Sequence, residues 1–578
     1  MTNTCPCDIS IAITGSGGAG SITAGELLLS LAGKNGRYGM MRRSFGPQIR
    51  GGEAAALVRI GGRPIECMND SYDMLGALDW QNADRFADEI ALRSDSTIIA
   101  DPGAGAVPEA IRALGVEIIE IPMKQLAKGV PLGRPNMVAL GLVAHWLDFC
   151  ADEAAELVRH TFGRKGDEIV AGSIGAFTAG FTEPSIVQAR AARTLPGRDQ
   201  CGDDGEKWDL SGNEGCGLGA VRGGIRFAAA YPITPASDLL EWLAPRLDKL
   251  GGSLVQAEDE LASINMVIGA SFGGVPSMTA TSGPGLALML ESLGLSVASE
   301  TPSVVVNVMR GGPSTGIPTK SEQVDLNIAL HGMHGDAPHL VLGALDHADC
   351  VLTTEWSVRL SEALQTVAIV LTDQSLAQSR ALVPAPVYEL PDIPPRRMAE
   401  ADEDYQRYEI TADGVSPMAV PGTPCSTYVA DGLEHTEAGK PSTAAADHAR
   451  QLDKRLSKIA DFDYGDLWAD VRGNASTAII TWGSTTTAVR EAAERLQQSG
   501  QEVKVIALRL LMPASPEKLA EELEQVTRVL IVEQSHGRQF YHYLRAYYDI
   551  VADIETLARP GPLLLTPGEI VEHIENWS

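Results

Sequence analysis

A single threonine lies between two prolines in the segment RFAAAYPITPAS, residues 226–237. The apolar run before it predicts a buried strand, and Pro232 and Pro235 exclude a helix between them, so Thr234 should lie on a loop where a strand ends. Parallel α/β sheets bind ligands at that edge, where a hydroxyl can reach a substrate oxygen. The ordinary alternative is that Thr234 is the N-cap, with Pro235 in the first turn, of a helix that runs to about Leu243. A threonine can fill both roles.

Three carboxylates stand together at Glu258, Asp259 and Glu260, directly before an apolar run that predicts a helix. The positive end of the helix dipole stabilises acidic side chains at this position, and that role accounts for most such clusters. A more specific role is to accept a hydrogen bond from the aminopyrimidine ring nitrogen of thiamine diphosphate, which promotes the imino tautomer that deprotonates the thiazolium carbon. One of the three could supply that carboxylate.

An arginine and several hydroxyls occupy a third loop. A predicted strand delivers Arg310 into the sequence RGGPSTGIPTK, which also carries Ser314, Thr315 and Thr319. Arginine offers a two-pronged donor to a carboxylate, and a nearby hydroxyl adds direction. The alternative is a surface loop whose arginine caps a strand end. The turn TATSGPG at 279–285 opens another helix and exposes backbone N–H groups, as cofactor-facing loops do.

The N-terminal region contains another glycine-rich turn, GSGGAG at 15–20, after a predicted strand at 8–14. The pattern invites comparison with dinucleotide sites, but no acidic residue stands where the ribose would need one. The turn is therefore a weak signal, and an NAD-linked dehydrogenase is disfavoured.

Strand–helix alternation predicts that these residues are positioned by three α/β blocks, the first of them doubly wound. The blocks and their connections are residues 1–188, a linker at 189–210, 211–382, an irregular segment with one helix near 444–459 at 383–475, and 476–578. The further elements expected in the outer blocks are helices at 22–31, 108–114 and 487–499, and strands at 96–100, 117–121, 476–481, 502–508 and 529–533.

The bulk composition excludes several classes of function. A net charge of −29 argues against binding nucleic acid or an anionic membrane, which need a basic surface. No stretch has the length of a transmembrane helix and no signal-peptide pattern opens the chain, so we expect a soluble cytoplasmic protein. The eight cysteines include no CxxC pair and no run typical of iron–sulfur ligands, so any such cluster should lie on another chain.

Taken together, these segments resemble the α subunit of 2-oxoacid:ferredoxin oxidoreductases. GNEG, RFAAAYPITPAS, QAEDELASIN, TATSGPG and RGGPSTGIPTKSEQ follow one another in that family's order and spacing, and with the outer blocks the resemblance covers nearly the whole chain. It implies a γ-type domain associated with coenzyme A at 1–188, a pyrimidine-type thiamine-diphosphate domain at 211–382 and a transketolase C-terminal-like domain at 476–578. The fold class expected is α/β throughout.

The resemblance also implies roles for the central residues. Glu260 takes the family's position for the carboxylate that faces the aminopyrimidine of thiamine diphosphate. Thr234 would contact the carboxylate or keto group of a 2-oxoacid, and Arg310 and Thr319 would hold its carboxylate. Glu260, Thr234 and Arg310 are therefore the expected catalytic residues.

In the outer blocks the resemblance implies a coenzyme A site and an architectural domain. RSFGPQIRGG at 43–52 and GRPNM at 133–137 resemble the γ domain, although an ordinary loop role stays open for each residue. His536, in the last block, is expected to be a hydrogen-bonded loop histidine in a dimer-forming domain. The expected coenzyme A contacts are Gly15, Gly17, Gly18, Ser44, Arg50, Arg134 and Asn136.

One motif is missing. Thiamine enzymes hold the diphosphate and its magnesium with Gly-Asp-Gly and an asparagine about thirty residues later, and no such stretch occurs. In the family a β subunit provides this site, its Mg²⁺ and a [4Fe-4S] cluster, so we expect no metal on this chain. The assembly expected from the resemblance is a dimer of α–β heterodimers. Ferredoxin should dock mainly on β, because the acidic α chain would repel an acidic carrier.

The implied reaction is oxidative decarboxylation. A 2-oxoacid, coenzyme A and two oxidised ferredoxins give acyl-CoA, carbon dioxide and two reduced ferredoxins, and the reverse reaction would fix carbon dioxide. The fused γ–α order and the RGGPSTGIPTK loop resemble those of 2-oxoglutarate enzymes more than those of pyruvate enzymes, and this resemblance favours 2-oxoglutarate with succinyl-CoA as product. Two alternatives stay open: the same chemistry on pyruvate or branched-chain 2-oxoacids, and a non-catalytic coenzyme A-binding or scaffold subunit.

Overall fold

The computed structural model describes residues 8–46, 52–80, 83–189, 205–317, 319–401 and 403–577. They divide into two compact units. Unit 1 comprises the described parts of Met1–Leu210 with Ser379–Ala385 and Thr566–Gly568, and unit 2 comprises Ser211–Gln378, Pro386–Leu565 and the end of the chain. Between them they contain three mixed α/β sheets, as the sequence predicts.

Unit 1 is built on an eight-stranded mixed sheet with the order β6-β5-β4-β1-β3-β2-β14-β7. Its strands are β1 (Asp8–Gly15), β2 (Tyr38–Phe45), β3 (Ala54–Gly61), β4 (Tyr72–Ala77), β5 (Leu92–Ala100), β6 (Glu117–Glu120), β7 (Lys207–Ser211) and β14 (Arg380–Pro384). Its helices are α1 (Ser21–Lys34), α2 (Glu109–Arg112), α3 (Met123–Lys128), α4 (Pro135–Trp146), α5 (Ala151–Phe162), α6 (Asp167–Phe181) and α7 (Pro184–Ala189). The predicted elements β1, α1, β5, α2 and β6 are all present.

The sheet of unit 1 is only partly parallel. β1 pairs parallel with β4 but antiparallel with β3, and β3 pairs antiparallel with β2. The apolar run of β1 is buried on both faces: Ile11 and Ile13 join the core with α1, whereas Ala12 joins a second core on the other face. The prediction of a doubly wound unit is therefore right for the parallel half and wrong for the antiparallel strands β2 and β3.

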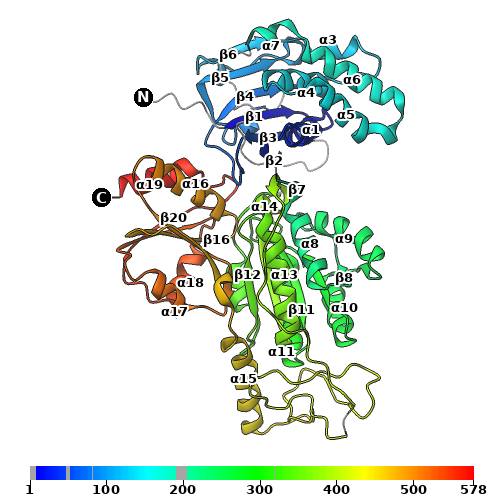
Figure 1. The fold of residues 1–578 in the computed structure, drawn as a ribbon, viewed down its shortest axis with the longest axis vertical. Coiled ribbons are helices and arrows are strands. Elements are labelled where there is room, and N and C mark those ends of the chain that lie inside the picture. Colours follow the sequence, from blue (N-terminus) through cyan, green and yellow to red (C-terminus); the bar gives the residue numbers. More distant parts are fainter. Residues whose placement is uncertain are drawn as a thin grey trace. The chain divides into compact units, whose positions relative to one another are not determined.

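The central sheet of unit 2 has seven strands in the order β18-β12-β13-β11-β10-β8-β9 (Figure 1). Its strands are β8 (Phe227–Ala230), β9 (Ser253–Gln256), β10 (Ser277–Thr281), β11 (Ser303–Met309), β12 (Leu340–Gly343), β13 (Val367–Asp373) and β18 (Leu510–Met512). Its helices are α8 (Gly212–Gly223), α9 (Ser237–Lys249), α10 (Glu260–Phe272), α11 (Gly283–Ala298), α12 (Leu326–His331), α13 (His347–Leu364) and α14 (Gln374–Gln378). All pairs in this sheet are parallel except the one between β18 and β12.

The C-terminal sheet of unit 2 follows the order β15-β17-β16-β19-β20. Alternate residues of β16 face opposite cores: Ile479 packs with α16 and α19, and Ile480 packs with α17 and α18. Figure 1 shows one helix pair above this sheet and the other below it. The elements are β15 (Ala469–Arg472), β16 (Thr477–Trp482), β17 (Lys504–Leu508), β19 (Arg528–Glu533), β20 (Asp553–Ala558), α16 (Thr485–Gln498), α17 (Pro516–Glu522), α18 (Gln539–Tyr547) and α19 (Pro567–Asn576).

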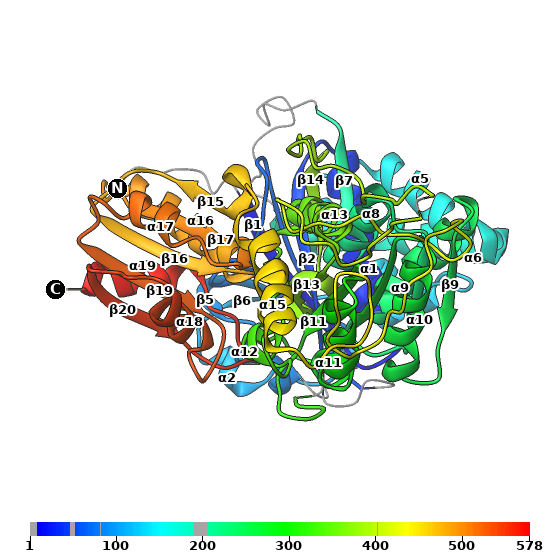
Figure 2. The same cartoon turned by 90° about the horizontal axis from the view of Figure 1, so that it is seen from below.

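The segment between the two sheets of unit 2 is irregular up to α15 (Ala445–Ala460), the one helix predicted there. It runs across the C-terminal ends of α10 and α11, as Figure 2 shows from below. Arg396 donates to the carbonyl of Ser271 at 2.7 Å, and Arg407 donates to the carbonyl of Glu300 at 2.8 Å. The segment is therefore bound to the central domain by buried arginines.

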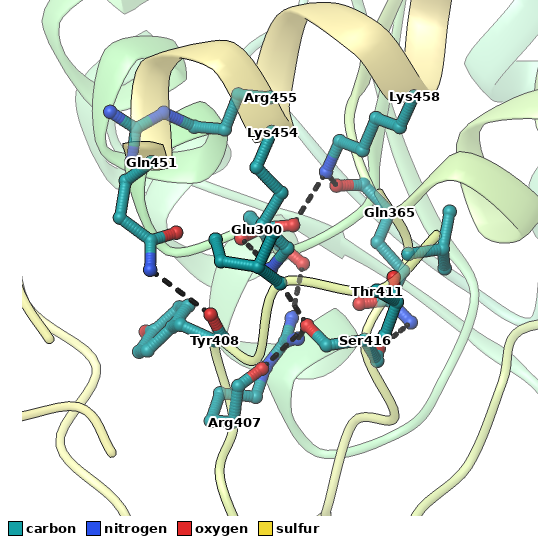
Figure 3. Close-up of polar contacts among 12 residues, drawn as sticks. Glu300, Gln365, Arg407, Tyr408, Thr411, Ser416, Gln451, Lys454, Arg455 and Lys458 are labelled. Atoms are coloured by element: carbon teal, nitrogen blue, oxygen red, sulfur yellow. Dashed lines mark hydrogen bonds and ion pairs between the residues drawn. The ribbon is translucent and has the colours of Figure 1, made fainter. Parts of the chain in front are cut away.

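A buried set of charges fixes α15 to the same place; we call Glu300, Arg407, Lys454 and Lys458 the Glu300 cluster (Figure 3). The carboxylate of Glu300 accepts from Lys454 Nζ at 2.7 Å and from Lys458 Nζ at 2.8 Å. All four side chains are at most 4% exposed. The cluster thus holds one negative and three positive charges in the interior of unit 2.

The fold shifts the pKa values in the Glu300 cluster. Burial alone would raise the pKa of Glu300, but the positive charges of Lys458, Lys454 and Arg407 outweigh it and lower that pKa. Burial lowers the pKa of Lys458 to about 8, although Glu300 opposes the shift. The carboxylate is therefore ionised at neutral pH, and burial lowers the pKa of Lys454 as well.

Candidate active site at the carboxyl edge of the central sheet

The order of the central sheet reverses between β8 and β10. The chain passes from β8 through α9 to β9 on one side, and from β10 through α11 to β11 on the other. Loops that leave adjacent parallel strands in opposite directions open a crevice at their carboxyl ends, where open α/β sheets bind ligands. Thr234 follows β8, the turn before α11 follows β10, and Arg310 follows β11.

Thr234 lies on the loop after β8, as predicted, but it does not cap a helix. α9 begins at Ser237 with Ala236 as its N-cap, and it extends to Lys249. The alternative that made Thr234 the N-cap and placed Pro235 in the first helical turn is therefore wrong. Instead, Nη1 of Arg310 donates a 2.8 Å hydrogen bond to the backbone carbonyl of Thr234.

The fold separates the three carboxylates that adjoin one another in sequence. Asp259 is the N-cap of α10, and its side chain accepts from the backbone N–H of Ala262 at 2.7 Å. Glu258 and Asp259 are exposed, whereas Glu260 is only 8% exposed. The helix-start role predicted for the cluster is thus confirmed for Asp259, and Glu260 is the one carboxylate turned into the protein.

Glu260 lies against the start of α11. A Cβ atom at Gly285 would lie 2.8 Å from Cγ of Glu260 and 2.9 Å from its Oε1, so any larger residue at this position would displace the carboxylate. Thr281, at the end of β10, contacts the same glycine through its hydroxyl, which would lie 2.1 Å from that Cβ. Residue 285 must therefore be glycine for Glu260 to keep this position.

Arg310 follows β11 and is half-buried. Burial lowers its pKa, and the negative charge of Asp325 opposes the shift. Burial raises the pKa of Asp325, against the effects of Asn307, whose Nδ2 donates to it at 2.8 Å, and of Arg310. Thr319 is also half-buried and has a φ of 42°, a conformation that a β-branched residue seldom adopts.

Several buried polar atoms at this edge have no hydrogen-bond partner among the described residues. In native interiors, polar atoms without a protein partner usually form hydrogen bonds with a ligand or with ordered water. As hydrogen-bond donors and acceptors, the atoms at this edge fit the polar aminopyrimidine end of thiamine diphosphate. The atoms are Oδ1 of Asn213, Oγ of Ser282, Oδ1 of Asn307 and Nε of Arg310.

Sequence reasoning did not single out Asn213, Asn307 or Asp325. Asn213 donates to the carbonyl of Pro235 at 2.9 Å and so supports the Thr234 loop from α8. Only their positions in the sequence could have pointed to these residues. Asn213 lies in GNEG, Asn307 lies three residues before Arg310, and Asp325 lies two residues after Ser321-Glu322-Gln323. Within the described residues, no group of three His, Cys, Asp or Glu side chains is arranged to hold a metal ion.

The predicted coenzyme A residues lie in unit 1, where the glycine turn follows β1. Asn136 is buried, and its Nδ2 donates to the carbonyl of Gly20 at 3.2 Å, which connects the GRPNM segment to this turn. Ser44 is buried in β2, and its hydroxyl donates to Glu89 at 3.0 Å. Gly15 ends β1, Gly17 and Gly18 are exposed, Arg134 is exposed just before α4, and Arg50 lies outside the described residues.

His536 is exposed on the loop between β19 and α18. Burial raises the pKa of Glu322, and the nearby charge of His536 acts in the opposite direction. None of the described helices is long and apolar enough to span a bilayer.

Comparison with known proteins places all three sheets in one family. The family model described as pyruvate flavodoxin/ferredoxin oxidoreductase, thiamine diP-binding, matches residues 218–454. The family model described as pyruvate ferredoxin/flavodoxin oxidoreductase matches residues 10–183. The transketolase C-terminal domain matches 468–560. The α subunit of 2-oxoacid:ferredoxin oxidoreductase 2 of Aeropyrum pernix is 30% identical over 94% of both chains. This chain is an α subunit of the 2-oxoacid:ferredoxin oxidoreductase family. The resemblance noted in the sequence is thereby confirmed.

Other relatives of this α subunit differ in how much of their length is matched. The α subunit of 2-oxoacid:ferredoxin oxidoreductase 1 of Sulfurisphaera tokodaii is 35% identical over 58% of this chain, and the match spans 56% of that relative. A solved structure of 2-oxoglutarate:ferredoxin oxidoreductase from Magnetococcus marinus, with 2-oxoglutarate, coenzyme A and succinyl-CoA bound, has a TM-score of 0.90 at 38% identity. The match covers 98% of this chain and 99% of the chain in that structure.

Proposed function

We propose that this α subunit forms part of a 2-oxoglutarate:ferredoxin oxidoreductase. The proposed reaction is the reversible, coenzyme A-dependent conversion of 2-oxoglutarate into succinyl-CoA and carbon dioxide, with two ferredoxins as electron acceptors. The observation that carries the proposal is the buried carboxylate of Glu260 against Gly285, at the same sheet edge as the Arg310–Thr234 pair. The choice of 2-oxoglutarate is supported by the substrate named for the Magnetococcus marinus structure, which matches over nearly the whole chain.

Each residue of the site has a distinct part in this proposal. Bound thiamine diphosphate would supply the carbanion that attacks the keto carbon. Glu260 would accept a hydrogen bond from the aminopyrimidine and favour the tautomer that removes the thiazolium proton. Arg310 would pair with the carboxylate at C1 of the substrate while it holds the Thr234 loop, and Thr234 and Thr319 would orient the same end through their hydroxyls.

The proposed enzyme needs a second subunit. The chain has no Gly-Asp-Gly motif with its distant asparagine, so a β subunit would hold the diphosphate, Mg²⁺ and a [4Fe-4S] cluster. With a net charge of −29, the α chain would repel an acidic ferredoxin, which favours docking on β. The γ-type domain in unit 1 would bind coenzyme A, and the proposed assembly is a dimer of α–β heterodimers.

The first test is a comparison of substrates. The α chain is coexpressed with its β subunit, and ferredoxin reduction is measured with 2-oxoglutarate, pyruvate and a branched-chain 2-oxoacid, each with coenzyme A. We expect the highest kcat/KM with 2-oxoglutarate. Every 2-oxoacid carries an α-carboxylate, so the residues proposed to bind this group do not distinguish between substrates. A higher kcat/KM with pyruvate would therefore support the pyruvate alternative.

The second test addresses catalysis itself. Glu260→Gln should lower kcat by about a hundredfold or more, as expected when an acid–base group is removed from its cofactor. The matched control is Glu258→Gln, which makes the same chemical change two residues away on an exposed side chain and should leave kcat unchanged. Equal activity of the two variants would favour the scaffold alternative.

A further inference from the structure

Asp325 lies between two segments of the candidate site, although it belongs to none of the motifs assigned above. Its carboxylate accepts the 2.8 Å hydrogen bond from Asn307, which lies in β11 three residues before Arg310. The same carboxylate faces the start of α11, because a Cβ atom at Gly283 would lie 2.6 Å from its Oδ1. One side chain thus contacts both the strand that delivers Arg310 and the helix start next to Glu260.

The segment that carries Asp325 is held on both sides. Gln323 donates to the carbonyl of Trp482 at 2.9 Å and accepts from the backbone N–H of Gln534 at 2.8 Å. The backbone carbonyl of Asp325 accepts from Ala329 at 3.0 Å in the first turn of α12. The loops of the C-terminal sheet and the start of α12 therefore fix the position from which the carboxylate reaches the site.

The surroundings of Asp325 are almost closed to water and contain few charges. Asp325 is 9% exposed, and Asn307 is fully buried. The cation that faces it is Arg310, and the neighbouring acid is Glu322, which in turn faces His536. Charges interact strongly in such a poorly hydrated place, so the state of Asp325 affects the attraction of Arg310 for any anion.

We propose that Asp325 is a positioning residue for the 2-oxoacid clamp. Through Asn307 and Gly283 it holds the end of β11 against the start of α11, and its negative charge competes with the substrate carboxylate for Arg310. This inference rests on the proposed function, since it takes Arg310 as the partner of the substrate. Because Asp325 touches no reacting atom, it should act on KM more than on kcat.

The proposal predicts a pH dependence. As pH rises through the pKa of Asp325, the side chain becomes charged and weakens the hold of Arg310 on the substrate carboxylate, which is ionised throughout. The KM of the wild-type α–β complex for the 2-oxoacid should therefore rise with pH. Glu322 can add to this trend, so the contribution of Asp325 is defined by the difference between wild type and variant.

The experiment compares α–β complexes that carry Asp325→Asn, Asp325→Ala or, as an exposed control, Asp336→Asn. We expect Asp325→Asn to make KM nearly independent of pH and about tenfold lower than wild type at the alkaline end, which corresponds to about 1.4 kcal/mol, with little change in kcat. Asp325→Ala should instead lower kcat/KM, because the contacts to Asn307 and Gly283 are lost. The control should follow the wild-type curve.

A purely structural Asp325 gives a different result: both variants lose kcat/KM and keep the wild-type pH slope, which overturns the proposal. The dissociation constant of 2-hydroxyglutarate, an unreactive analogue, is measured by calorimetry at each pH and should show the same trend as KM. A wild-type complex that binds this analogue without reducing ferredoxin contradicts the proposed function, while the dissociation constants still decide the role of Asp325. A wild-type complex that fails to bind it overturns both.

Discussion

Replacing Glu300 by glutamine should loosen α15 and the segment before it. The substitution keeps the size of the side chain and removes the one negative charge of the Glu300 cluster. Lys454 and Lys458, which donate to the carboxylate at 2.7 and 2.8 Å, would then lie with Arg407 in the interior without a counter-charge. Breaking a buried ion pair in this way costs about 3 to 5 kcal/mol.

The burial of the cluster indicates a cost in the upper part of this energy range. Glu300 compensates two fully enclosed lysines, so its loss leaves more than one buried positive charge without a counter-charge. The variant has one means of relief: because the pKa of Lys458 is already about 8, this lysine can lose its proton at moderate cost. We therefore expect a loss of about 5 kcal/mol in local stability at neutral pH and a clearly smaller loss above pH 8.

Amide hydrogen exchange measures this effect locally, which matters because a chain with several domains has no single unfolding free energy. The exchange of residues 445–460 should accelerate strongly in Glu300→Gln, whereas α1 in unit 1 should keep its protection. Asp453→Asn is the matched control, because it removes one exposed negative charge from the same helix. Equal exchange of α15 in the two variants would refute the view that the Glu300 cluster anchors the helix.

The remaining predictions concern the site and the same cluster. Arg310→Lys should raise KM for the 2-oxoacid about tenfold or more, because a lysine cannot bind the substrate carboxylate with two parallel bonds and also hold the Thr234 carbonyl; steady-state kinetics of the α–β complex would show an unchanged KM if this is wrong. Gly285→Ala should lower kcat nearly as much as Glu260→Gln does, since the added methyl group displaces that carboxylate, and a crystal structure with Glu260 in place would contradict the reason. Local stability of α15 should rise from pH 8 upward, since a lowered pKa of Lys458 means that the unfolded chain binds more protons there; Lys458→Met should remove this rise in hydrogen exchange, and a rise that persists would assign it to other groups.

The sequence predicts the elements of the parallel regions well. Apolar runs such as 8–14 and 529–533 are flanked by turn residues and form β1 and β19 almost at the expected bounds. Arg310 and Thr234 could be placed at strand ends for the same reason. The prolines around Thr234 show that no helix lies between them, but they do not fix where the next helix starts, so the cap assignment failed.

Other features depend on contacts between residues far apart in the sequence. Glu258 and Glu260 are identical in type and two positions apart, and only the packing of α10 against the start of α11 decides which one is buried. The position of Asp325 in the site depends on its contacts with Asn307 and Gly283, neither of which adjoins it in the sequence. Glu300 is separated from Lys454 and Lys458 by more than 150 residues and from Arg407 by 107, so no local pattern could reveal the cluster.

The pairing of β18 with β12 has a consequence for the synthesis of the chain. Leu510–Met512 cover one edge of the central sheet, whose other strands are complete by Asp373. Until the ribosome has released these three residues, β12 presents an unpaired edge of apolar residues, which is a template for association with other chains. A nascent or truncated chain that ends before Leu510 should therefore depend on chaperones in a way that the full chain does not.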